Sequence, residues 1–429
     1  MTIYFRHESD ATSMMSDVKK DRRPLVMLQQ ACIPHYRRHL YDALGTDPRF
    51  QFQLLADPGA VVPFLPLAEA PRQCEFQAAT QYVIRLPYGF SLSWQPTVLS
   101  AVLRRRPDLI VAQGSPYDLT AWMLTIAGRI MGVPVLLWTH GLQGDESGVK
   151  WTVRALLYRL SRGLLLYGDH AKQLLISKGL AADRLHVIYN SLDNAEQSAV
   201  SARITSADCE RFRRSLGIGA DERAISFTGR LQPVKRLPWL LQALNLVVSE
   251  GKNVHLLLVG EGSDRPQLES LANELGLNRL VHFLGAMYDE ARLGLVLSAS
   301  DLAVVPSGAG LSVMHALAYG TPVLLHDHVE EHFPEWEAVQ DGETGWFYRN
   351  GDLSDCARKI VDALFPKPQK PTMVSACRAM ITRRYNSGTH AALFIDAIAK
   401  YCPLPSPGET EQACSETISR SVQLEHSVR

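Results

Sequence analysis

Short apolar runs alternate along the chain with longer segments in which apolar residues recur every three or four positions. The short runs predict buried strands, and the longer segments predict amphipathic helices. Alternation of the two predicts an α/β protein with parallel, doubly wound sheets. We expect strands at 24–28, 108–112, 133–138, 164–167, 185–189, 224–228, 254–259, 281–284, 302–305 and 323–325, and helices at 36–44, 119–131, 172–178, 237–249, 266–275 and 311–319.

The alternation occurs as two series separated by a polar stretch, which predicts two Rossmann-like domains that face each other. The length of 429 residues suits two domains. The expected divisions are a flexible N-terminal tail (1–23), a first domain (24–195), a connection (196–221), a second domain (222–365), C-terminal helices that cross back to the first domain (366–402) and a disordered tail (403–429).

Charge and cysteine content narrow the functional classes. The 44 Lys and Arg residues balance 44 Asp and Glu residues, which argues against a protein that binds nucleic acid over a broad surface. Seven spread cysteines without a Cys-x-x-Cys pair indicate reduced thiols. The first residues lack the apolar core of a secretion signal, and no apolar run reaches the roughly 20 residues that span a bilayer. We therefore expect a cytoplasmic protein.

Basic residues and glycines follow two strands of the second series, where doubly wound sheets bind their ligands. Gly229 and Arg230 come directly after strand 224–228, and Lys235 lies near the start of the next helix. Two cations at this place suit a diphosphate, although a solvated surface pair is the alternative. The loop PSGAG at 306–310 follows strand 302–305. Its glycines allow backbone amides to approach phosphate or sugar oxygens, with a simple tight turn as the alternative.

Polar residues also follow strands of the first series. His140 comes after strand 133–138, where it is placed to bind a sugar hydroxyl or assist a proton transfer, or only to satisfy its neighbours. Asn190 comes after strand 185–189, where it shapes the cleft or makes a structural turn. Three glutamates after strand 323–325 either meet a bound ligand or form a solvated acidic loop: Glu330, Glu331 and Glu335.

In this order and spacing the motifs resemble those of the family-4 retaining glycosyltransferases of the GT-B fold, over roughly residues 24 to 400. The motifs are TGRL (228–231) with Lys235, LVGEG (258–262), FLG (283–285), the loop 306–311, GTPV (320–323) and DGETGW (341–346). The resemblance implies two Rossmann-like domains that enclose a nucleotide-sugar. It further implies that Arg230 and Lys235 hold the donor diphosphate and that His140 lines the donor sugar. Gly229, Gly262, Gly308, Ala309, Gly310 and Leu311 are the other donor-binding candidates that it implies.

The chain departs from the family pattern at two positions of the glycine loop. Family members usually carry two glutamates eight positions apart there, one for the donor sugar and one for the ribose, whereas this chain has Ser307 and His315. A serine hydroxyl is able to bond a sugar hydroxyl, and a neutral histidine is able to accept from a ribose hydroxyl. A bacterial branch of the family resembles this chain in that run, in HGLQGDE (140–146), which contains Glu146, and in YNSLD (189–193). We therefore expect a subgroup, with lost activity as the alternative.

The resemblance implies transfer of a hexosyl or N-acetylhexosaminyl group with retention, in which the departing diphosphate takes the acceptor's proton. The donor is a substrate, and neither a cofactor nor a catalytic metal is expected. The acceptor, a sugar or a lipid-linked glycan of bacterial surface polysaccharide or glycoconjugate assembly, is expected near 29–37 and 141–148. A sugar-nucleotide epimerase and a non-catalytic nucleotide-sugar binder are the alternatives. Helix 150–162 either touches anionic lipids, as a peripheral membrane contact, or packs on its own sheet.

Overall fold

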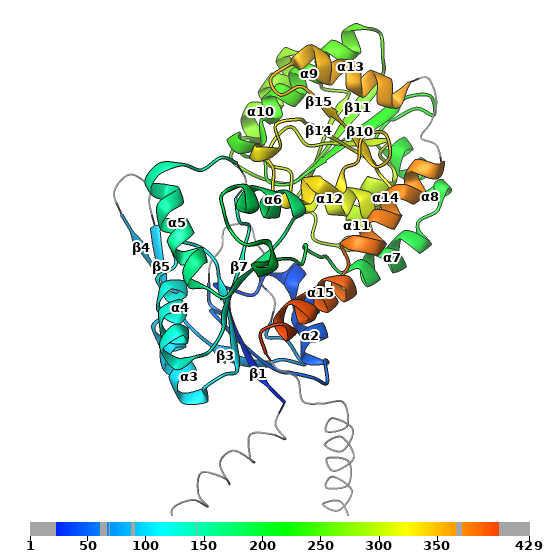
Figure 1. Cartoon of the computed structure of the whole chain (residues 1–429). Helices are drawn as coiled ribbons and strands as arrows, with labels where there is room; N and C mark the ends of the chain where they lie inside the picture. Colours follow the sequence, from blue (N-terminus) through cyan, green and yellow to red (C-terminus); the bar gives the residue numbers. More distant parts are fainter. Residues whose placement is uncertain are drawn as a thin grey trace, which may run out of the picture.

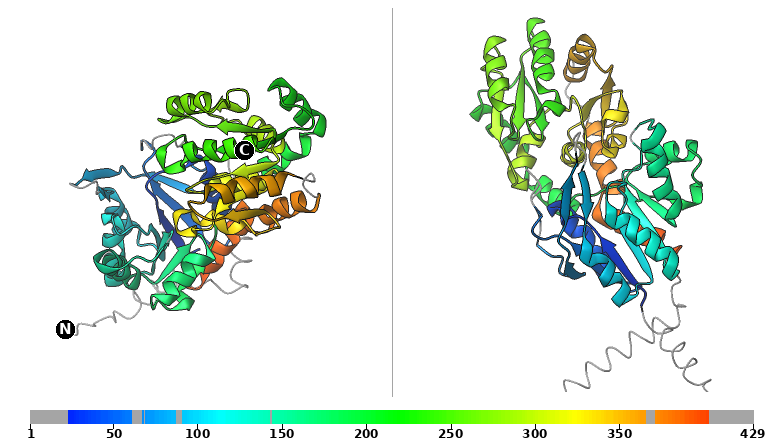
Figure 2. Two further views of the ribbon diagram at one scale, coloured as in Figure 1. Left: turned by 90° about the horizontal axis from the view of Figure 1, so that it is seen from above. Right: turned by 90° about the vertical axis from the view of Figure 1, so that its left-hand side faces the viewer.

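The computed structural model describes residues 23–60, 67, 69–86, 91–142, 144–365 and 371–402. Figure 1 shows two α/β domains, with the N-terminal domain below the second one, and the two further views of Figure 2 show the same division. The predicted C-terminal tail, and all but the last residue of the predicted N-terminal tail, lie outside the described residues. No helix in the described part of the chain is long and apolar enough to span a bilayer.

The first domain is built on seven parallel strands in the order β3-β2-β1-β6-β7-β8-β9. Successive side chains of a strand point to opposite faces of its sheet. Leu28 of β1 therefore joins the core on one face, while Met27 joins the core on the other. The strands are β1 (Leu25–Gln29), β2 (Gln51–Ala56), β3 (Glu75–Ala78), β6 (Leu109–Gln113), β7 (Val135–Thr139), β8 (Gly163–Leu166) and β9 (Leu185–Val187), with a hairpin of β4 (Tyr82–Arg85) and β5 (Ser91–Trp94). The helices are η1 (His35–Arg37), α2 (Arg38–Gly45), α3 (Pro96–Arg105), α4 (Leu119–Met131), α5 (Gly148–Leu160), α6 (Asp169–Ser177) and η3 (Ala182–Arg184).

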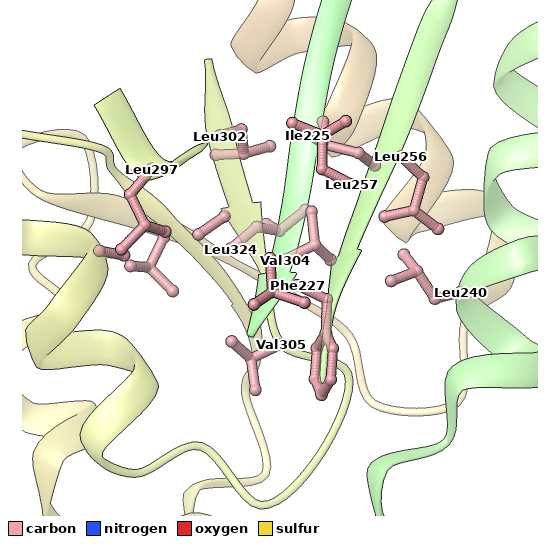
Figure 3. Close-up of a cluster of buried hydrophobic side chains, with 14 of the residues drawn as sticks. Ile225, Phe227, Leu240, Leu256, Leu257, Leu297, Leu302, Val304, Val305 and Leu324 are labelled. Atoms are coloured by element: carbon pink, nitrogen blue, oxygen red, sulfur yellow. The ribbon is translucent and has the colours of Figure 1, made fainter. Parts of the chain in front are cut away.

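The second domain is built on six parallel strands in the order β12-β11-β10-β13-β14-β15. Its core is mainly aliphatic, with Phe227 near the end of a central strand (Figure 3) and with three buried tyrosines, Tyr319, Tyr348 and Tyr385. The strands are β10 (Arg223–Thr228), β11 (Val254–Val259), β12 (Val281–Gly285), β13 (Leu302–Val304), β14 (Val323–His326) and β15 (Gly345–Tyr348). The helices are η4 (Pro233–Lys235), α9 (Leu237–Ser249), α10 (Arg265–Glu274), α11 (Glu290–Ser298), α12 (Leu311–Ala318), η5 (Val329–Glu331), η6 (Pro334–Ala338) and α13 (Leu353–Leu364).

Both sheets follow the doubly wound order in which the first strand of each domain lies in the middle, as predicted. The direction of winding changes between β1 and β6 in the first sheet and between β10 and β13 in the second. These switch points open a crevice beyond the carboxyl ends of the strands, which is where such folds bind their ligands. The loops after these four strands therefore position the candidate site.

The polar segment between the two series is largely helical. It forms α7 (Asn194–Arg203) and α8 (Ser206–Ser215), and both helices pack against α11 of the second domain. Each helix starts at a side-chain cap: Asp193 accepts from the amide of Glu196, and Thr205 with Asp208 forms a capping box. The segment is thus attached to the second domain rather than spanning the gap between domains.

The chain returns to the first domain at its C-terminal end. Helix α14 (Pro371–Arg384) packs against α12, and α15 (Ser387–Ala399) packs against α2 of the first domain. Figure 1 shows α15 beside α2. Leu192 on the outgoing segment pairs in parallel with Asn386 on the returning one, so the two crossings between the domains lie side by side.

Polar contacts from the second domain fix the start of α6 in the first. The Gly168 N-cap of α6 has no side chain, and the carboxylate of Glu337 accepts instead from the amides of Asp169 and His170, both at 2.8 Å. A carboxylate at a helix N-terminus also meets the positive end of the helix dipole. A second-domain side chain thus caps a first-domain helix.

Candidate functional site

A cavity of about 670 Å³ lies at the carboxyl ends of the first-domain strands and is closed on one side by the second domain. Its first-domain wall is formed by residues that follow four strands and by part of α5. The lining residues that bear on its chemistry are Gln30, Arg37, Trp138, His140, Asp145, Glu146, Arg154, Tyr167, Glu330, Glu331 and Phe333.

Aromatic rings form much of the first-domain wall of this cavity. The His140 and Tyr167 rings stack at 4.4 Å, and the guanidinium of Arg37 lies over the Trp138 ring at 4.5 Å. Arg37 also donates to the hydroxyl of Tyr167 and, at 3.1 Å, to Oε1 of Gln30. A stacked, hydrogen-bonded guanidinium keeps one orientation, so this wall is preorganised.

His140 faces the cavity as a neutral imidazole. Burial between the domains, helped by the nearby positive charge of Arg37, lowers its pKa to about 4. No described residue forms a hydrogen bond with its ring nitrogens. A neutral ring is able to donate from one nitrogen and accept at the other, which suits a sugar hydroxyl, but at neutral pH it is a weak base.

The second-domain wall contributes acids and one ring. Phe333 meets the edge of His140, with ring centroids 5.9 Å apart. Glu331 pairs with Arg236 at 2.9 Å, whereas Glu330 has no ion pair with any described residue. The Glu330 side chain reaches across to Gly144, where an added Cβ would lie 2.6 Å from the carboxylate. Glu330 is therefore available to hydroxyl groups in the cavity.

Glu335, the third glutamate of this segment, is buried at the domain interface instead of lining the cavity. Its Oε1 accepts from the Asn190 side chain at 2.7 Å, and its Oε2 is buried without a hydrogen-bond partner. Burial raises the pKa of this carboxyl, against the opposing effect of the Asn190 hydrogen bond. Asn190 thus joins the two domains rather than facing ligand space.

A second pocket, of about 220 Å³, lies within the second domain at the carboxyl ends of β10, β11 and β12. Thr228, Gly229 and Arg230 form one side, and Ser312 with His315 on α12 forms another. The remaining lining residues are Val259, Gly260, Glu261, Ala286, Met287, Tyr288 and Leu293. Its mixed apolar and polar lining and its place at the switch point suit a nucleoside.

Two cations without acidic partners stand between this pocket and the glycine loop. The Arg230 side chain is exposed at the pocket and has no hydrogen bond or ion pair with any described residue. Lys235 donates to the carbonyl of Gly308 and has no carboxylate partner among the described residues. Partial burial, together with the like charge of Arg230, lowers the pKa of Lys235 to about 8. A bound anion relieves both effects.

The loop 307–311 is held in place from both sides. Gly308 has a φ of 60°, and an added Cβ there would lie 3.0 Å from Nζ of Lys235. The amide of Ala309 donates to Nδ1 of His332 at 3.2 Å, which fixes the tautomer of that ring. Ser307 is buried, and α12 begins at Leu311 directly after Gly310. The loop is thus a rigid backbone surface beside Lys235.

His315 is supported by a polar network behind the second pocket. Its Nδ1 accepts from Nε2 of Gln197 at 3.1 Å and lies 3.7 Å from the carboxylate of Glu290, which also accepts from the Tyr319 hydroxyl. Burial raises the pKa of Glu290, but the hydrogen bonds that its carboxylate accepts outweigh this effect and leave that pKa below its usual value. A neutral His315 in this network carries its proton on Nε2. It would then donate to a ligand, whereas we expected it to accept.

The remaining predicted residues, Gly262 and Glu146, make contacts within the protein itself. An added Cβ on Gly262 would lie 2.1 Å from the carbonyl oxygen of Leu231, so this glycine permits close backbone packing and lines neither pocket. Glu146 lines the large cavity and binds Arg154 through both oxygens, at 2.7 and 2.8 Å. Among the residues that the structure describes, no group of three His, Cys, Asp or Glu side chains is arranged to hold a metal ion.

The sequence analysis placed the acceptor near residues 29–37, which include Arg37, but it assigned no role to Arg37, Trp138 or Tyr167 individually. Their roles depend on contacts between segments more than 100 residues apart in the chain, which no local pattern reports. The available signal is positional, because Trp138 and Tyr167 lie at the carboxyl ends of neighbouring strands.

Comparison with known proteins identifies glycosyltransferase sequence in both domains. Residues 222–365 match the family "Glycosyl transferases group 1", and residues 61–196 match "Glycosyltransferase Family 4". The D-inositol 3-phosphate glycosyltransferase of Rhodococcus erythropolis is 35% identical over 199 residues, which cover 42% of this chain and 44% of that protein. The α-D-kanosaminyltransferase of Streptomyces kanamyceticus is 24% identical over 303 residues, which cover 64% and 75%. The chain spans less than half the length of the Rhodococcus relative.

Solved structures show the same fold at low sequence identity. Anabaena Alr3699/HepE in complex with UDP superposes with a TM-score of 0.66 at 20% identity, covering 88% of this chain and all of the other. Sucrose-phosphate synthase from Thermosynechococcus elongatus gives a TM-score of 0.64 at 18% identity, covering 88% of this chain and 99% of the other. The expected GT-B fold is thereby confirmed.

Proposed function

From two domains that match glycosyltransferase families on a GT-B fold, we propose that this chain transfers a sugar from a nucleotide-sugar to an acceptor. The observation that carries the proposal is the pair Arg230 and Lys235, two cations beside a nucleoside-sized pocket without any described carboxylate partner. A diphosphate is the ligand whose charge and length suit such a pair. Anabaena HepE, which shares the fold, is described in complex with UDP and with UDP-glucose.

In this proposal the leaving group receives most of the catalytic help. Negative charge grows on the diphosphate as the anomeric C–O bond breaks, and Arg230, Lys235 and the loop amides stabilise that charge. His140 and Glu330 hold hydroxyl groups in the large cavity. With a pKa of about 4, His140 is a poor proton acceptor at neutral pH. We therefore assign the acceptor's proton to the departing phosphate oxygen on the same face of the sugar, which gives retention.

The transferred group in this proposal is a hexosyl or N-acetylhexosaminyl unit, and the acceptor is a sugar or a lipid-linked glycan of surface polysaccharide or glycoconjugate assembly. A fold neighbour, WaaG, is described as a glycosyltransferase involved in lipopolysaccharide biosynthesis. Helix α5 supports a peripheral membrane contact, because Val149, Val153 and Leu156 are exposed on it while Leu157 packs into the core. That contact would keep the protein at the inner face of the cytoplasmic membrane.

A two-step experiment tests the proposal. Thermal-shift measurements with uridine, guanosine and adenosine diphosphates identify the base, and mass spectrometry then follows the matching nucleotide-sugars with and without glycan acceptors. Transfer predicts a glycosylated acceptor and free nucleoside diphosphate. Conversion of the donor without an acceptor would indicate an epimerase, and binding without either change would indicate a non-catalytic binder. Absence of binding by any of the three diphosphates would contradict the proposal outright.

A further inference from the structure

Arg37 is a cation in the wall of the large cavity, and no acidic residue in the described part of the chain forms an ion pair with it. No described carboxylate lies within the 4.0 Å limit of an ion pair with it, and its polar neighbours are Gln30 and the hydroxyls of Tyr167 and Tyr41. Its Nε is buried and has no hydrogen-bond partner. A buried charge is costly unless it is paired, and arginine remains protonated at any ordinary pH. The guanidinium is therefore an unpaired positive charge next to ligand space.

Neighbouring arginines show that pairing is otherwise available. Arg38, the next residue, lies 3.7 Å from Asp42 and 4.0 Å from Glu69. Arg154, which lines the same cavity, binds Glu146 through both carboxylate oxygens. Arg37 differs from both because aromatic rings, rather than acids, surround it.

Among the charged groups around the cavity, Arg37 is the one best placed to bind an anion. Asp145 pairs with Lys178, and Glu331 pairs with Arg236, so these acids are already neutralised. Glu330 has no ion pair within the described ranges and stands on the second-domain side, where it repels anions. Glu335 influences Arg37 through its charge but makes no ion pair with it.

We infer that Arg37 binds an anionic group, a phosphate monoester or a carboxylate, carried by the acceptor. The inference rests on the proposed function, which assigns the donor diphosphate to Arg230 and Lys235 in the other domain. Arg37 shares its wall with Gln30 and His140, on the side where an acceptor enters. Stacking on Trp138 fixes the guanidinium plane, and its planar donor fork matches the oxygens of either anion.

The test measures binding of small anionic sugars to the full-length protein by isothermal titration calorimetry, with the nucleoside diphosphate already bound. The probes are glucose 6-phosphate and glucuronate, with glucose as the neutral comparison and inorganic phosphate as the bare anion. We expect at least one anionic sugar to bind at least tenfold more tightly than glucose, and R37Q to abolish this preference, because a hydrogen bond between two charged groups is stronger than one to a neutral hydroxyl. Which anionic sugar responds distinguishes phosphate from carboxylate.

R38Q is the matched control, because it removes the adjacent, paired arginine, and it is expected to bind like the parent. R37K keeps the positive charge but loses the planar pair of donors, so its affinity for the anionic sugar should lie between those of the parent and R37Q. It replaces R37Q in the test if R37Q does not fold. Equal binding of glucose and both anionic sugars by the parent, no binding of any probe, or a preference that survives R37Q would overturn the inference. Nucleoside diphosphate binding, measured in the same samples, reports on the proposed function separately and should not change in R37Q.

Discussion

The two domains share one strand order but present different chemistry at the carboxyl ends of their strands. The second domain offers backbone amides, glycines and two cations, whereas the first offers aromatic faces, a neutral imidazole and, besides the paired Arg154, the guanidinium of Arg37. In each, an unpaired basic residue is followed by a paired one: Lys235 by Arg236, and Arg37 by Arg38. In both regions a basic residue without an acidic partner among the described residues thus faces ligand space, a feature that net charge does not show.

Replacement of Arg230 should lower activity more than any other change on the second-domain side. R230A is expected to lower kcat by roughly 10²- to 10³-fold, about 3 kcal/mol, because the charge that grows on the leaving diphosphate loses a donor. Steady-state kinetics with an identified donor measures this. R279A, which removes an exposed arginine at the opposite end of β12, is the control and should keep parent activity. Turnover of R230A within threefold of the parent would exclude the role.

The pH dependence of diphosphate binding tests Lys235. Its pKa in the free protein is lowered to about 8, and only the charged form attracts the ligand. Binding must therefore weaken as pH rises through that value, with a dissociation constant about tenfold larger at pH 9 than at pH 7. The variant K235R does not titrate in this range and should show a flat profile. Parallel profiles for the two proteins would show that another group titrates.

His315 offers a finer test of the same pocket. If its Nε2 hydrogen donates to a ribose hydroxyl, the parent should bind the ribonucleoside diphosphate a few-fold more tightly than its 2′-deoxy form, at about 1 kcal/mol for one hydrogen bond. H315A should lose that preference while retaining the base preference. Q197A should reduce it, since the Gln197 amide donates to Nδ1 and holds the imidazole from behind. A preference unchanged in H315A would place the ribose elsewhere.

Substitution of Glu337 tests whether its contact between the two domains contributes to the stability of the protein. E337Q loses the charge and one of two hydrogen bonds at the start of α6, which should lower the free energy of unfolding by about 1 kcal/mol. Urea denaturation measures this, and E343Q, at an exposed glutamate, is the control. Equal stability of both variants would show that the cap contributes nothing.

Metal removal should have the smallest effect. The candidate site supplies positive charge through side chains and amides, so we expect turnover to stay within twofold of its starting value after treatment with EDTA and buffer exchange. Loss of activity that added Mg²⁺ or Mn²⁺ restores would contradict this expectation.

The sequence predicted the central strands of both sheets because they are continuous apolar runs. Strands β2 and β15 were not predicted. Gln51 and Gln53 interrupt the apolar run of β2, and β15 directly follows a turn signal at 341–345. On the second-domain side, Gly229, Arg230 and Lys235 lie within seven residues of each other, so local spacing reveals them. Arg37 meets Trp138 and Tyr167 only after the sheet has assembled, and that arrangement requires the fold.

The paired crossings at Leu192 and Asn386 have a mechanical consequence. Both covalent links between the domains pass through one small region, so a rotation of one domain against the other requires backbone change at only a few neighbouring residues. Such a rotation carries Phe333 and Glu330 toward or away from His140 as a unit. The same rotation would separate Glu337 from α6 and expose the first turn of that helix to water.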